Sequence, residues 1–67
     1  MLKLKDVKVG SWVMDITGIY EVTDINERVK AVYTLNEVLE NESGEDEVSE
    51  SQRFLTKSEM KLMDIVG

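Results

Sequence analysis

Residues 9 to 25 read VGSWVMDITGIYEVTDI, which is two runs of β-forming residues around a turn. The first run, Val9 to Ile16, and the second run, Ile19 to Ile25, are rich in β-branched and aromatic residues, as strands are. Thr17-Gly18 lies between them, and Gly adopts the positive φ that a tight hairpin requires at little cost. The pattern predicts an antiparallel β-hairpin.

The segment that follows predicts a third strand beside this hairpin. Asn26-Glu-Arg28 is a short polar turn, and Val29 to Asn36 then places apolar residues at every second position. Residues with this spacing share one face of a strand; they are Val29, Ala31, Tyr33 and Leu35. Short connections between three such runs predict an antiparallel meander.

The C-terminal part combines one strand signal with one helix signal. Gln52 to Leu55 is predicted as a fourth strand. Thr56 and Glu59 have the spacing of a capping box, in which each residue's side chain bonds the other's backbone N–H at the start of a helix. We therefore expect a short helix or helical turn within residues 57–66. The competing interpretation is a fifth strand built on Met60, Leu62 and Ile65.

The run VKVGSWV from Val7 to Val13, followed by Thr17-Gly18 and by Tyr20 to Ile25, resembles the opening of SH3-like small β-barrels of the KOW and Tudor type. The resemblance covers about the first half of the chain. A length of 67 residues predicts a single domain over residues 1–67, and the resemblance implies that this mostly β domain folds as a five-stranded antiparallel barrel. It also implies a short helix or helical turn near the C-terminus, with Leu62 to Val66 as the closing strand.

The negative charge of the protein is concentrated in one segment. The chain has 14 acidic and 8 basic residues and a net charge of -6. Seven of the acids, and no Lys or Arg, lie between Glu37 and Glu50. Because Asn, Ser and Gly residues interrupt this segment, we expect a long acidic hairpin loop at about residues 40–51.

A local excess of carboxylates steers basic partners, so the first hypothesis is a small accessory or regulatory module that binds a protein with a basic surface. The predicted electrostatic contacts are Glu42, Glu45, Asp46 and Glu47. Trp12 and Tyr20 are the predicted anchors, because aromatic residues dominate the binding energy of interfaces. The competing interpretation is a solvated loop that keeps the protein monomeric.

Three further hypotheses compete with this one. Nucleic acid would stack on sheet aromatics and contact the only basic cluster, Lys3, Lys5 and Lys8, but so small a patch argues against it. Trp12 and Tyr20 with Asp15 and Glu21 would instead form a cage for a methylated ammonium group. A structural homo-oligomer would associate through strand edges, so the expected state is a monomer or a weak homo-oligomer.

Composition argues against catalysis and against membranes. The chain has no His and no Cys, and it contains no phosphate-binding loop or nucleophile motif. We therefore expect no enzymatic activity, no cofactor and no metal site; the acidic segment also lacks the glycine position of a calcium-binding EF-hand. Without a secretory signal or an apolar run of about 20 residues, the expected location is cytoplasmic. In size and acidity the chain resembles bacteriophage accessory proteins.

Overall fold

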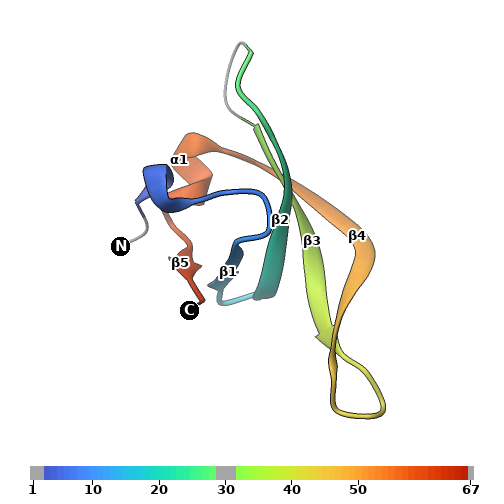
Figure 1. Ribbon diagram of the computed structural model, residues 1–67. Coiled ribbons are helices and arrows are strands. Elements are labelled where there is room, and N and C mark those ends of the chain that lie inside the picture. The colour runs from blue at the N-terminus through green and yellow to red at the C-terminus, as the bar shows by residue number, and fades with distance from the viewer. Residues whose placement is uncertain (1–2, 29–31, 67) are drawn as a thin grey trace.

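The computed structural model describes residues 3–28 and 32–66, and it is mostly β, as predicted. Its described residues form five strands, with a single turn of helix before the last strand (Figure 1). The elements are η1 (Leu4–Asp6), β1 (Trp12–Asp15), β2 (Gly18–Asn26), β3 (Val32–Glu40), β4 (Asp46–Thr56), α1 (Lys57–Met60) and β5 (Asp64–Ile65).

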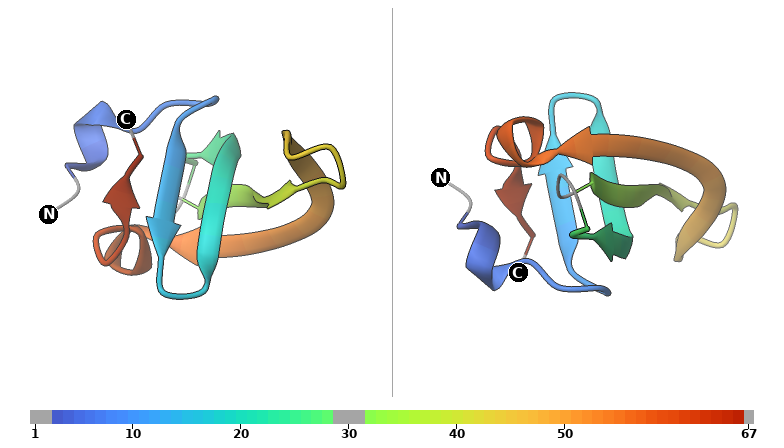
Figure 2. Two further views of the ribbon diagram at one scale, coloured as in Figure 1. Left: turned by 90° about the horizontal axis from the view of Figure 1, so that it is seen from below. Right: turned by 90° about the horizontal axis from the view of Figure 1, so that it is seen from above.

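All five strands form one antiparallel sheet with the order β4-β3-β2-β1-β5. The predicted meander is therefore confirmed for β1, β2 and β3. Hydrogen-bonded closure into a barrel is absent, since no pairing within residues 3–28 and 32–66 joins β4 to β5. Figure 2 shows that the sheet is nevertheless strongly curled, because β4 runs across the direction of β1 and β2.

The core lies on one face of the curled sheet, which we call the concave face. Alternate residues of the strands supply it, together with Val7 and two methionines at the C-terminal end. Its buried members are Val7, Val13, Tyr20, Val22, Tyr33, Leu35, Leu55, Met60 and Met63. Burial raises the pKa of the Tyr33 hydroxyl, and the charge of Glu27 raises it further. The predicted face residues Val29 and Ala31 lie outside the described residues.

The turn between β1 and β2 uses the predicted glycine in a slightly different register. Asp15 pairs with Gly18, so Ile16 and Thr17 form the loop. Gly18 has a φ of 149°, which side chains disfavour, and the Thr17 backbone N–H donates to the Asp15 carboxylate over 2.8 Å. This side-chain contact mimics a backbone turn and leaves Ile16 fully exposed at the tip.

The predicted acidic loop at residues 40–51 is much shorter in the structure, because β3 ends at Glu40 and β4 begins at Asp46. Asn41 makes the tight connection possible. Its side-chain oxygen accepts the backbone N–H groups of Ser43 and Glu45 over 2.9 and 3.0 Å, and Gly44 takes a φ of 80°. Most of the acidic segment is therefore strand and not loop.

A β-bulge interrupts the pairing of β3 and β4 and bends this long hairpin. Asn36 pairs with Gln52, but Val38 pairs with Val48, so Glu37 faces three residues of β4. The Asn36 amide donates to the Ser49 carbonyl over 3.0 Å, and its side-chain oxygen accepts the Thr23 hydroxyl over 2.8 Å. Bulges increase local twist, so this one helps to curl the sheet.

The C-terminal end contains the predicted helical turn, whereas the competing strand on Met60, Leu62 and Ile65 is wrong for its first two residues, since only Ile65 lies in a strand. Thr56 and Glu59 form the predicted capping box at the start of α1, which is only four residues long. The chain then continues into β5, which pairs with β1 through Val13 and Met14. The described residues thus contain a helical turn and a closing strand of two residues, shorter than the expected Leu62 to Val66.

Candidate functional site

The four acids predicted to bind a partner are all exposed at the tip of the β3–β4 hairpin. Figure 1 shows this tip projecting away from α1 and β5. Glu42 and Glu45 lie in the turn, whereas Asp46 and Glu47 begin β4. Because successive strand residues point to opposite faces, Asp46 and Glu47 do not form a single patch. Within the described ranges the only ion pair joins Arg53 and Asp15, so these four carboxylates are unpaired there.

Trp12, the first predicted anchor, is half-buried on the face of the sheet opposite the core, which we call the convex face. It pairs with Glu21 across β1 and β2. Its indole N–H donates to a Glu21 carboxylate oxygen over 3.2 Å. This bond holds the ring against the sheet while part of the ring stays accessible, which is the state of many interface aromatic residues.

Tyr20, the second predicted anchor, is not available to a partner, because its side chain is a core residue with an exposed fraction of 6%. The prediction failed because sequence alternation places Tyr20 on a face without showing which face the core covers. The alternative of a methylammonium cage, which also needs the Tyr20 ring, fails for the same reason. A guanidinium of the protein itself, that of Arg53, lies 5.5 Å from the centre of the Tyr20 ring.

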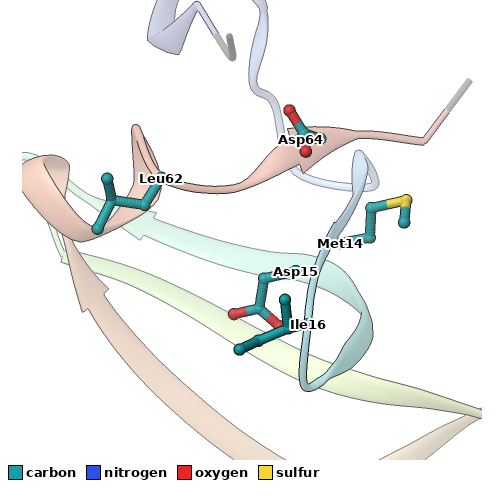
Figure 3. Close-up of a pocket in the computed structure, with 5 residues that line it drawn as sticks. All are labelled: Met14, Asp15, Ile16, Leu62 and Asp64. Carbon is teal, nitrogen blue, oxygen red and sulfur yellow. The ribbon is translucent and has the colours of Figure 1, made fainter.

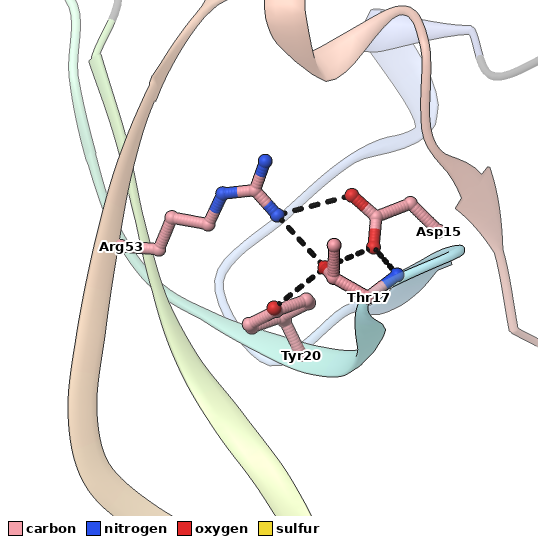
Figure 4. A network of polar contacts seen from close by, with 4 residues as sticks. All are labelled: Asp15, Thr17, Tyr20 and Arg53. Atoms are coloured by element: carbon pink, nitrogen blue, oxygen red, sulfur yellow. Dashed lines mark hydrogen bonds and ion pairs between the residues drawn. The ribbon is translucent and has the colours of Figure 1, made fainter.

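Arg53 and Asp15 close a polar network across the concave face (Figure 4). The Arg53 guanidinium donates to Asp15 over 3.0 Å and to the Thr17 hydroxyl over 3.2 Å. The Thr17 hydroxyl lies 2.8 Å from that of Tyr20. Hydrogen bonding from Thr17, followed by the guanidinium, holds the pKa of the Asp15 carboxyl below its usual value despite opposing burial. The bond to Asp15 likewise raises the pKa of Arg53.

This network has a structural role. β4 and β1 are separated by two strands in the sheet order, so a direct contact between Arg53 and Asp15 requires the sheet to curl. Arg53 was missed from the sequence, although a signal exists. Period-two alternation places Arg53 on the same face as Leu55. A charged group close to the core is costly unless it is paired, so a carboxylate partner is expected.

The remaining aromatics give little support for binding bases. Tyr33 has an exposed fraction of 3%, whereas Phe54 on β4 is largely exposed. The basic residues Lys3, Lys5 and Lys8 lie on the N-terminal segment around η1, exposed to solvent. Single-stranded nucleic acid is bound by stacking its bases on several aromatic rings beside a basic groove. The described residues do not provide this arrangement.

A groove of about 530 Å³ lies beside the end of β1 (Figure 3). Met14, Asp15 and Ile16 line one side, and Leu62 and Asp64 line the other side. Ile16 and Leu62 are among the most exposed apolar residues described. Three apolar side chains and two carboxylates line the groove, and none of its lining residues is basic.

Two other features are absent from the described residues. No three acidic side chains in residues 3–28 and 32–66 gather closely enough to hold a metal ion. None of the described helices has the length and apolarity to cross a membrane. In comparisons with known proteins, no family model matches the chain, and neither a curated protein nor a solved structure matches it significantly.

Proposed function

We propose that this protein is a small, non-enzymatic binding module whose β3–β4 hairpin docks onto a protein with a basic surface. The observation that supports the proposal is the placement of Glu42, Glu45, Asp46 and Glu47. They are exposed on a projecting hairpin, and no ion pair within the described residues neutralises them. Unpaired carboxylates on a protrusion attract cations from solution and accelerate association with a basic partner.

The proposed scaffold is an SH3-like small barrel left open at one seam. The strand order, with β5 beside β1 and a helical turn before β5, supports it. In such a scaffold the curled sheet holds the hairpin away from the core. The hairpin is stiffened by the Asn41 turn, so its charges are presented without a large cost in chain entropy on binding.

Selection from a library of random peptides tests the proposal without a known partner. The immobilised protein is expected to enrich peptides rich in Lys and Arg. Their binding should weaken as ionic strength rises from about 0.01 M to about 1 M, because the screening length falls from about 30 Å to about 3 Å.

Matched triple variants locate the site. Glu42→Gln/Glu45→Gln/Glu47→Gln removes three charges from the hairpin, and Asp6→Asn/Glu27→Gln/Glu59→Gln removes three exposed charges elsewhere, with Glu59→Gln keeping a capping-box residue. Only the hairpin triple should abolish the enrichment. Selected peptides without basic residues, or equal losses in both triples, would show that the hairpin is not a docking element.

A further inference from the structure

An apolar row crosses the convex face of the sheet, where no core covers it. Met14 pairs with Ile19, Ile19 pairs with Val38, and Val38 pairs with Val48. Directly paired residues of antiparallel strands point to the same face. The four side chains therefore form one continuous row from β1 to β4, which we call the convex row.

Burial shows that the convex row is a cluster of its own. Val38 has an exposed fraction of 8%, yet it does not belong to the core cluster. Its cross-strand neighbours Ile19 and Val48 cover it and stay 36% and 40% exposed. Met14, at one end, is 42% exposed. An aligned set of partly exposed apolar side chains marks an interaction surface more often than scattered ones do.

The charges around the convex row specify its partner. On the convex face, the residues placed by the strand pairing include five acids and no Lys or Arg; the acids are Glu21, Asp24, Glu40, Asp46 and Asp64. Asp64 pairs with Met14 at one end of the row. Glu21 lies on one side of the row, two residues from Ile19. Glu40 and Asp46 lie on the other side, each two residues from a row valine.

This arrangement disfavours several occupants. Phosphates of nucleic acid and anionic lipid headgroups would be repelled by the carboxylates. A second copy of this chain would bring like charges together, which is costly at an interface. A protein segment with an apolar stripe and basic residues on both sides matches both the row and its charges.

The spacing of the row favours a helix. Neighbouring strands lie about 4.8 Å apart, so the four residues span about 14 Å across the sheet. An α-helix presents one apolar stripe with a pitch of about 5.4 Å, close to the strand spacing. A strand presents same-face residues about 6.7 Å apart, which does not match.

We infer that the convex row binds a basic amphipathic helix of a partner protein, with its apolar stripe on Met14, Ile19, Val38 and Val48 and its Lys or Arg side chains on the flanking acids. The inference rests on the proposed function, for which it supplies the partner's chemistry. Long-range attraction comes from the hairpin, and discrimination between basic partners comes from the row.

Two synthetic peptides of about 18 residues, long enough to form a helix alone, test the inference. One is a Leu/Lys amphipathic helix, and the other is its scramble with the same composition and no apolar stripe. Binding is followed by amide chemical shifts of the ¹⁵N-labelled protein. The amphipathic helix should bind about tenfold more tightly than the scramble, because only it places leucines on the row.

Variants separate the row from the hairpin. Ile19→Thr/Val48→Thr keeps β-branched residues and should cost about tenfold in affinity for the amphipathic helix. The matched control is Val9→Thr/Leu39→Thr, which changes exposed apolar residues off the row and should cost little. If the row variant folds poorly, a spin-labelled amphipathic helix is added to the unmodified protein instead. The amide resonances of Met14, Ile19 and Val48 should then be the first to broaden.

Each remaining outcome is decisive. Equal affinity for both peptides, equal effects of the row variant and its control, or broadening elsewhere would overturn the convex-row inference. The proposed function would still stand in those cases if the hairpin triple variant weakened both peptides. Failure of both peptides to bind at low salt would overturn the inference and the proposed function together.

Discussion

Removing the guanidinium of Arg53 is expected to loosen the curl of the sheet. Arg53→Met keeps an unbranched chain over the Tyr20 ring but deletes the bonds to Asp15 at 3.0 Å and to Thr17 at 3.2 Å. These bonds connect β4 to the β1–β2 turn across two intervening strands. The variant should therefore unfold more easily.

The structure sets the size of the effect. The side chains of Arg53 and Asp15 are 39% and 19% exposed, so solvent screens the pair and its contribution is about 0.5–1.5 kcal/mol, between surface and buried values. The contact of Arg53 with the Tyr20 ring contributes about 0.5–1 kcal/mol. Together the loss is about 1–2.5 kcal/mol, a large fraction of the roughly 3–10 kcal/mol expected for a domain of this size.

Urea unfolding followed by Trp12 fluorescence measures this loss. The control is Arg28→Met, which removes an exposed guanidinium just after β2 and should change the unfolding free energy by less than about 0.5 kcal/mol. A double-mutant cycle with Asp15→Asn should give a coupling energy of about 0.5–1.5 kcal/mol. Zero coupling, or equal losses in the two arginine variants, would refute the idea that this ion pair holds the curl.

Three more predictions follow from the same structure. The pKa of Asp15 is lower in the folded protein than in the unfolded chain. The ionised Asp15 carboxylate therefore stabilises the folded protein above the unfolded pKa of about 3.9, and this stabilisation is lost as pH falls through the folded-state pKa. The difference in urea midpoint between the wild type and Asp15→Asn should accordingly shrink from pH 7 to about pH 2. Leu35→Ala should cost about 2–5 kcal/mol, since Leu35 is fully buried, whereas Leu62→Ala should cost under about 0.5 kcal/mol by the same unfolding assay. Thr56→Ala breaks the capping box and should cost about 1 kcal/mol in calorimetry; no loss would mean that α1 is held by Met60 packing alone.

Local patterns predicted much of the fold. The hairpin at residues 9 to 25, the strand containing Tyr33 and Leu35, and the Thr56–Glu59 capping box all depend on neighbouring residues, whose preferences do not need the rest of the chain. The position of the acidic segment was predicted correctly, but the prediction that it forms a loop was wrong. Its Asn and Ser residues indicated a loop, whereas pairing with β3 extends β4 to Asp46, and pairing between strands overrides local preference.

The candidate site depends more on tertiary structure. By itself, the sequence determined that the chain is mostly β, that its negative charge lies between Glu37 and Glu50, and which residues alternate along each strand. Only the tertiary structure decided which of the two faces the core covers. Because a shift of one residue exchanges the faces of a strand, alternation alone could not show that Tyr20 is buried beneath Arg53. For the same reason it could not show that Met14, Ile19, Val38 and Val48, distant in the chain, meet on the uncovered face.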